Sequence, residues 1–256
     1  MKKLSAVVSL LLIVSGCCIF GGAKIRQQCN FDQKICARNV QVLQNAIEKF
    51  KADGGAYIVF DVAENKKVEE TYLNFDENTT VWAYNPLRLF YLTAGLNSKV
   101  FSKKDIVFNT NASSDFKKVS DHDKKRVFDL LGVDDFNTPQ QILAGYLNVF
   151  TNKEKLLNQT QLKALKSAVA DNVRTGAAKK ANIAGAEVSG LSATSEHKLE
   201  DGRVITVFVG TFKAQAKEFA ILTILDNPKG LKETYGFNSA GWNVVPAAGS
   251  IIENLK

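Results

Sequence analysis

The stretch AEVSGLSATSEHKLEDGRVITVFVGTF, residues 186–212, predicts a strand, a turn at Asp201–Gly202 and a second strand. The second half is rich in Val, Ile and Phe, as a buried strand requires. Residues 189–195, in contrast, are mostly small Ser, Gly, Ala and Thr. Small side chains let a ligand approach the backbone N–H and C=O groups of a strand closely. We therefore expect residues 189–195 to line a cleft.

Strand-forming residues recur on both sides of this hairpin. Residues 219–225 follow it closely and predict a third consecutive strand, and residues 56–63 and 68–73 predict an earlier hairpin. Strands that are adjacent in sequence usually pair antiparallel. Because helical segments lie between the two groups of strands, the order predicts an α+β fold in which helices cover a five-stranded antiparallel sheet.

Helices are predicted by capping residues and by apolar side chains at helical spacing. The first runs along residues 36–50 and is expected to end at Gly54–Gly55. Thr138 followed by Pro139 predicts the start of a later helix, and Thr160 is the predicted N-cap of the next one. Further helices are predicted near residues 86–96, 120–131 and 251–255.

The first residues predict a secreted lipoprotein. Two lysines precede an apolar run over residues 4–14, which is too short to span a bilayer as a mature helix. Val14-Ser15-Gly16-Cys17 matches the bacterial signal in which the Cys17 thiol is acylated and becomes the new N-terminus. We therefore expect residues 1–16 to be removed as a signal peptide, residues 17–34 to form a lipid-anchored segment and residues 35–256 to form one domain.

The remaining cysteines and the two histidines indicate whether a disulfide or a metal site is expected. Cys29 and Cys36 are the pair expected to form a disulfide in an oxidising envelope compartment. Cys18, rather than Asp, follows the acylated residue, which favours the outer membrane over the inner one. His122 and His197 are the two histidines, and neither lies near a cysteine or the other histidine in the chain. No metal site and no cofactor are predicted.

The charge of the chain bears on its partners. The formal charge is +7, and it falls to +5 when Lys2 and Lys3 leave with the signal peptide. A basic protein on the periplasmic side of a membrane favours anionic lipid or polymer surfaces, and nucleic acid is not expected as a partner there. The same charge is also compatible with a role in solubility alone.

The order of elements, together with particular stretches of sequence, resembles the transpeptidase domain of class B penicillin-binding proteins, the division-type enzymes that cross-link peptidoglycan. The resemblance covers roughly residues 35–256. VQVLQNAIEKF followed by GGAYIVFDVAENKKVEE is similar to the family's opening helix and first hairpin, and WAYNPLRLFYLTAGL resembles its nucleophile helix. FNTPQQILAGYLNVF and LKALKSAVADNVRTGAAKKANIAGAEVSG resemble later helices. The resemblance implies a penicillin-binding-protein or β-lactamase-like fold with a reduced helical subdomain.

The resemblance also implies where the family's catalytic groups would lie. These enzymes use a Ser nucleophile with a Lys one helical turn later, and a Lys-Thr-Gly strand that holds the substrate carboxylate. The Ser position falls on Asn85, the Lys position on Arg88, and the strand triplet on Leu191-Ser192-Ala193, followed by a matching Thr194. An amide is no acyl-accepting nucleophile, and a guanidinium with a pKa above about 12 cannot act as a base.

We therefore predict a degenerate transpeptidase domain that binds or scaffolds peptidoglycan or the proteins that synthesise it, with the small-residue strand as a peptide-binding edge. One alternative is an active D,D-transpeptidase or carboxypeptidase that uses a relocated serine such as Ser113 or Ser192. Another is a purely structural lipoprotein of the envelope.

Overall fold

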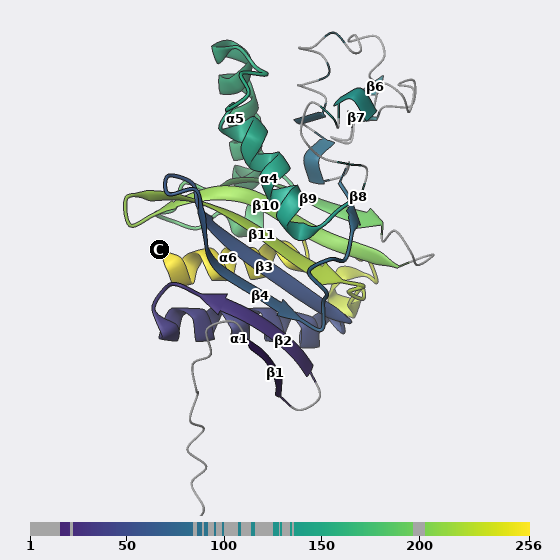
Figure 1. Ribbon diagram of the computed structural model, residues 1–256. Helices are drawn as coiled ribbons and strands as arrows, with labels where there is room; N and C mark the ends of the chain where they lie inside the picture. Colours follow the sequence, from purple (N-terminus) through teal and green to yellow (C-terminus); the bar gives the residue numbers. More distant parts are fainter. Residues whose placement is uncertain are drawn as a thin grey trace, which may run out of the picture.

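The computed structural model describes residues 16–20, 23–83, 86–88, 90–91, 95, 99, 107–108, 114–115, 125–127, 129, 134, 136–196 and 203–256. A seven-stranded sheet in the order β1-β2-β4-β3-β11-β10-β9 runs through the molecule, and each neighbouring pair of strands is antiparallel (Figure 1). The α+β class predicted from the sequence is confirmed. The sheet is larger than the expected five strands, because the N-terminal residues add two strands at one edge.

Five strands of the sheet match the segments predicted from the sequence. They are β3 (Gly54–Asp61), β4 (Lys66–Leu73), β9 (Ser189–Glu196), β10 (Val204–Ala214) and β11 (Lys217–Asp226). Two pairs of very short strands lie outside the main sheet: β5 (Val81–Trp82) pairs with β8 (Phe136–Asn137), and β6 (Val107–Phe108) pairs with β7 (Ser114–Asp115).

The N-terminal edge of the sheet differs from the expectation. β1 (Gly16–Phe20) pairs with β2 (Ala23–Cys29), and β2 pairs with β4. Cys29, at the end of β2, is joined by a disulfide to Cys36 in the helix that follows. β2, in the segment expected to carry the anchor, is thus connected to the rest of the fold by its pairing with β4 and by this disulfide.

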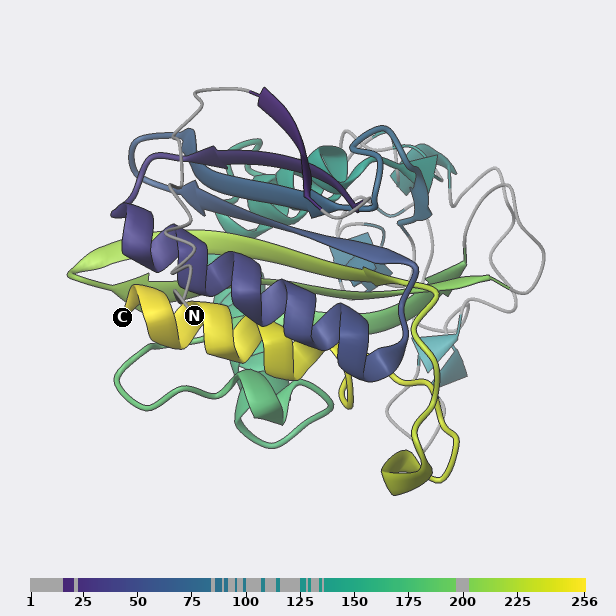
Figure 2. The same cartoon turned by 90° about the horizontal axis from the view of Figure 1, so that it is seen from below.

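Two helices cover one face of the sheet. α1 (Gln33–Phe50) and α6 (Val244–Leu255) lie side by side there, as Figure 2 shows. α1 ends at Lys51 in a left-handed conformation, so Gly54 and Gly55, the expected end of this helix, instead open β3. In the described part of the chain, no helix combines the length and the apolar character needed to cross a bilayer.

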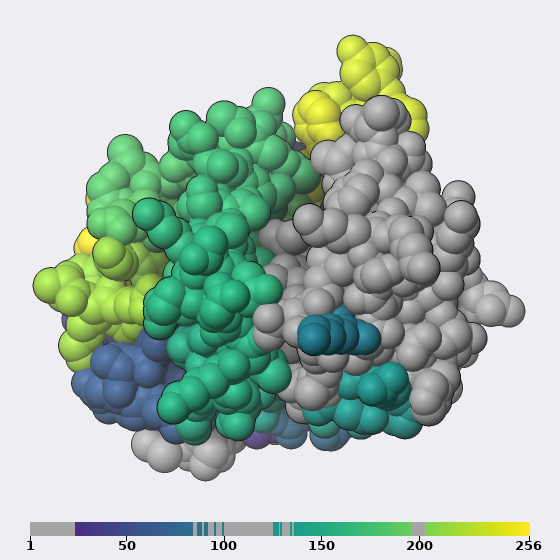
Figure 3. All heavy atoms as spheres, turned by 90° about the horizontal axis from the view of Figure 1, so that it is seen from above, coloured from purple at the N-terminus to yellow at the C-terminus, as the bar shows by residue number. Residues whose placement is uncertain are grey.

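The opposite face carries α4 (Pro139–Phe150), α5 (Gln159–Arg174) and helical residues among 86–95 (Figures 1 and 3). Thr138 caps α4 as predicted, in a capping box with Gln141. The predicted cap at Thr160 is wrong, because Asn158 caps α5 and exchanges hydrogen bonds with Gln161. Two short 3₁₀ helices are η2 (Lys179–Ala181) and η3 (Lys232–Thr234). Each face of the sheet thus has its own apolar core.

A buried polar network ties the sheet to α1 and α6. Glu69 of β4 accepts a hydrogen bond of 2.5 Å from the hydroxyl of Tyr57 and one of 2.9 Å from Nδ2 of Asn39. Asn39 in turn accepts a bond of 3.0 Å from Asn254 of α6. Burial raises the pKa of the Glu69 carboxyl, since water no longer solvates its charged form. The pKa of Tyr57 is also raised, again mainly by burial.

This carboxyl makes the stability of the fold depend on pH. Because its pKa is raised in the folded state, its stabilising contribution is complete below the ordinary value of 4.5 and is lost as pH rises through the folded-state value. We expect the free energy of unfolding to decline less steeply between pH 4.5 and neutrality in Glu69→Gln than in the parent. Urea titrations across this range measure both slopes, and parallel profiles would contradict the assignment.

Candidate functional site

The small-residue strand β9 is packed tightly against β10. Gly190 lies opposite Gly210 in this pair. A Cβ atom at Gly190 would lie 2.7 Å from Cζ of Phe208 and 2.8 Å from the carbonyl oxygen of Val209. Both distances are shorter than real contacts, so glycine is required here by the packing of the strands.

Hydrogen bonds from neighbouring elements hold both ends of β9. Asn172 of α5 donates from Nδ2 to the carbonyl oxygen of Gly190 at 2.8 Å. Near the other end, the hydroxyl of Ser195 donates to the backbone carbonyl of Trp82 in β5. β9 is thereby fixed to the helical layer as well as to the sheet.

The bond at Gly190 also shows which backbone groups face the outer edge of β9, the last strand of the sheet. The Gly190 carbonyl points away from β10, toward Asn172. In an antiparallel strand the N–H and C=O of one residue point to the same side, and every second residue shares that side. The backbone groups of Ser192 and Thr194 therefore point to the outer edge as well.

The structure describes one of the two positions that the resemblance assigns to the nucleophile and its base. Arg88 is helical and half-buried, whereas Asn85 lies outside the described residues. Leu87, Phe90 and Tyr91, helical residues around Arg88, are buried. A guanidinium has hydrogen-bond donors and no acceptor, so Arg88 offers donors but no base.

The sequence resemblance assigns Leu191 to the position where the family holds the substrate carboxylate. Its side chain is 9% exposed, and it belongs to the same apolar cluster as Leu87 and Phe90 of the helical layer. Val209, its partner on β10, is in this cluster too. Leu191 is thus part of the apolar core on the α4–α5 face of the sheet.

The hydroxyl groups on β9 lack the surroundings of a nucleophile. Ser192 and Thr194 are half-buried, and the side chain opposite Ser192 on β10 is Phe208, which offers no base. A serine hydroxyl without a neighbouring base is a weak nucleophile. Ser113, the other relocated serine considered, lies outside the described residues, as do both histidines and the turn at Asp201–Gly202. Within the described residues, no group of His, Cys, Asp and Glu side chains could hold a metal ion.

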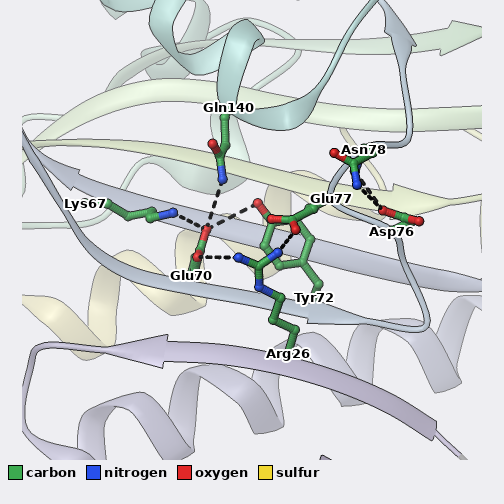
Figure 4. A network of polar contacts seen from close by, with 8 residues as sticks. All are labelled: Arg26, Lys67, Glu70, Tyr72, Asp76, Glu77, Asn78 and Gln140. Atoms are coloured by element: carbon green, nitrogen blue, oxygen red, sulfur yellow. Dashed lines mark hydrogen bonds and ion pairs between the residues drawn. The ribbon is translucent and has the colours of Figure 1, made fainter. Parts of the chain in front are cut away.

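A second polar cluster surrounds the buried Glu70 on β4 (Figure 4). The sequence did not predict this cluster. The Glu70 carboxylate lies 2.6 Å from Nζ of Lys67 and 3.9 Å from Nη2 of Arg26. Gln140 of α4 donates a bond of 3.4 Å to it, and Tyr72, whose pKa is raised to about 12 mainly by burial, donates another of 3.4 Å. These partners compensate the charge of the buried carboxylate, and the cluster joins β2, β4 and α4.

A pocket of about 230 Å³ lies beside this cluster, between α4 and the β3–β4 hairpin. Ile58, Phe60, Leu143 and Leu147 form most of its walls, with Lys67 at its polar end. β3, β11 and β10 separate β4 from β9 in the sheet. This pocket is therefore distinct from the edge of β9.

Comparison with known sequences gives one short match. No family model matches the chain. It is 32% identical over 90 residues to the probable peptidoglycan D,D-transpeptidase FtsI of Caulobacter vibrioides. The match covers 31% of this chain and only 15% of that relative.

Comparison with solved structures covers nearly the whole chain. The transpeptidase domain of FtsI4 D,D-transpeptidase from Legionella pneumophila superposes with a TM-score of 0.64 at 13% identity, over 88% of this chain and 97% of that one. The C-terminal domain of the Bacillus licheniformis BlaR penicillin-receptor gives a TM-score of 0.58 at 13% identity, over 82% and 93%. The resemblance seen in the sequence is thus confirmed, and the chain has the fold of the penicillin-binding transpeptidase domain.

Proposed function

We propose that this chain is a non-catalytic, penicillin-binding-protein-like module that binds extended peptides of peptidoglycan, or of the proteins that synthesise it, along β9. The observation that carries the proposal is the burial of Leu191 in an apolar cluster. The sequence resemblance assigns this residue to the family's carboxylate-binding position. The short match to a peptidoglycan transpeptidase supports the substrate class. The likeness to a domain titled a penicillin receptor supports binding as a use of this fold.

Loss of acyl transfer follows from the residues at the family's reactive positions. The reaction needs a nucleophile, a base and donors for the developing oxyanion within hydrogen-bond reach. Asn85 and Arg88 supply neither a nucleophile nor a base. An enzyme that used Ser192 instead would have to activate a hydroxyl that faces Phe208 across the strand pair.

Peptide binding follows from the position of β9 at the end of the sheet. An edge strand can pair its outward N–H and C=O groups with an added strand, which is a recurring mode of peptide recognition. Ser192 directs its backbone groups to this edge, and the small side chains along β9 permit close approach. Backbone pairing needs no reactive side chain, so it is compatible with the loss of the catalytic groups.

Attachment to a membrane is the second part of the proposal. Acylation of Cys17 would hold the module in the cell envelope on the periplasmic side, with the outer membrane favoured by Cys18 at the following position. More than one acyl chain anchors a protein stably, at about 0.8 kcal/mol for each buried CH₂. A tethered module would meet peptidoglycan at a high local concentration.

Proline at position 192 tests the binding edge. It removes the outward N–H of Ser192 but no ladder bond to β10, so we expect Ser192→Pro to stay folded and to lose about tenfold in affinity for purified sacculi. Ser192→Ala keeps the N–H and should bind like the parent. Sedimentation with sacculi measures binding, and thermal unfolding checks the fold. Equal binding by the proline variant, or no binding by the parent, would contradict the proposal.

Substitution of the two adjacent cysteines tests the anchor. In a Gram-negative host supplied with a clickable fatty acid, we expect Cys17→Ser to lose the label and to accumulate with its signal peptide, because the acylated thiol is missing. Cys18→Ser should remain labelled. Labelling of the Cys17→Ser protein would show that acylation at this residue is not the anchor.

A further inference from the structure

Large apolar side chains are exposed in one place. Tyr235, Phe237 and Trp242 are 88%, 71% and 47% exposed, and they are the exposed large apolar residues of the described chain. All three lie in the segment between β11 and α6, residues 227–243, which we name the aromatic loop. Single exposed apolar residues are ordinary, but a group of aromatic ones marks an interaction site.

The aromatic loop has a defined, hydrogen-bonded structure. The Thr234 hydroxyl oxygen lies 2.9 Å from the carbonyl oxygen of Leu231 and 3.0 Å from that of Phe237, and it accepts a bond of 3.0 Å from the Leu231 N–H. The side chain of Asn238 donates to the carbonyl of Pro228 across the base of the loop. These bonds fix the backbone that presents the aromatic rings, so little order has to be gained on binding.

The tip of the aromatic loop stands away from the rest of the molecule (Figures 2 and 3). Gly236 has a φ of 76°, and no atom lies within 4 Å of where its Cβ would be. Tyr235 has a φ of 52° and is the one aromatic residue among the described non-glycine residues with positive φ. Tyr235 is the C-cap of η3, and its N–H donates to the carbonyl of Lys232, so the end of this 3₁₀ helix fixes the backbone conformation at the tip.

The surroundings of the tip are basic. Lys229 and Lys232 are exposed on the loop, and Nζ of Lys180 lies 4.5 Å from the centre of the Trp242 ring. Glu233 is the acidic residue of the segment. The patch therefore combines exposed aromatic rings with a net positive charge, which complements an anionic surface.

We propose that the aromatic loop docks on an anionic lipid bilayer, with Tyr235 and Phe237 in the interfacial region and with Lys229 and Lys232 near the lipid phosphates. Aromatic rings with a polar group prefer the boundary between lipid headgroups and acyl chains. Each lysine close to such a surface adds electrostatic attraction to the lipid phosphates. The contact does not require acylation of Cys17, although a lipid anchor would strengthen it.

The shape of the loop favours lipid over a protein partner. The two most exposed rings project from a convex tip, and a protein partner would need a groove that fits them closely. A bilayer interface is fluid and accommodates a convex apolar tip without such a groove. The flanking lysines match the negative charge of an anionic leaflet.

A local fluorescent reporter tests the proposal. The full chain with Cys17→Ser, which removes the acylation site, is compared with the same chain carrying Phe237→Trp. Phosphatidylglycerol and phosphatidylethanolamine vesicles with brominated acyl chains should quench the added emission and shift it to shorter wavelengths. Ala164→Trp, on an exposed position of α5, is the matched control, and its added emission should not change. Because the reporter is local, vesicle binding by the N-terminal segment cannot produce this result.

Loss of binding and salt dependence complete the test. The double variant Phe237→Ser and Tyr235→Ser should lower the affinity for these vesicles by about tenfold. The double variant Lys229→Gln and Lys232→Gln should make vesicle binding less dependent on salt concentration. Lys153→Gln with Lys163→Gln, an equal change of charge on the α4–α5 side, should leave both unchanged. Water-like emission from the Phe237→Trp reporter in protein that sediments with vesicles would overturn the proposal. Failure of the parent to bind anionic vesicles would overturn the proposal as well. This holds even if the loop binds a soluble protein through Tyr235.

Discussion

The apolar cluster that Leu191 shares with Leu87 and Phe90 is the contact on which the interpretation of this fold depends. This cluster also contains residues of β3, β10, β11 and α4. A lysine in the place of Leu191 would have to keep its charge in this buried site, and burial without a partner is costly. Leucine removes that cost and adds apolar packing. If Leu191 occupies the family's lysine position, as we propose, the same residue leaves no cation to hold a carboxylate, so packing is gained where chemistry is lost.

The helices on the two faces of the sheet make different contacts with it. Beneath it, α1 and α6 pack on the sheet, and the buried Glu69 network links both helices to β4. Above it, α4 and α5 position β9 through contacts such as the bond from Asn172 to Gly190. β9 keeps one edge without a neighbouring strand in the described sheet, and the aromatic loop projects beyond the sheet as a separate exposed surface. The exposed edge of β9 and the aromatic loop are the two surfaces on which the proposed recognition depends.

The sequence predicts most of the fold because its signals are local. Strand-forming residues mark β3, β4, β10 and β11, the segment before the β10 strand predicts β9, and Pro139 behind Thr138 marks the start of α4. The cap of α5 was misplaced although Gln161, three residues after Asn158, carries the capping-box signal. Contacts between residues distant in sequence cannot be predicted from local signals. The Glu70 cluster joins residues from β2, β4 and α4, and β2 pairs with a strand far along the chain. The exposure of Tyr235 could not be predicted from the sequence either, because aromatic residues are buried in most folds.

Covalent labelling of the folded protein with a fluorescent penicillin tests the loss of acyl transfer most directly. With Asn85 and Arg88 at the reactive positions and Leu191 in the apolar cluster, no adduct should form above that of boiled protein, and intact-mass measurement should show no acylated species. An adduct that ampicillin blocks, and that Ser192→Ala or Ser113→Ala abolishes, would contradict the account and establish an active serine enzyme.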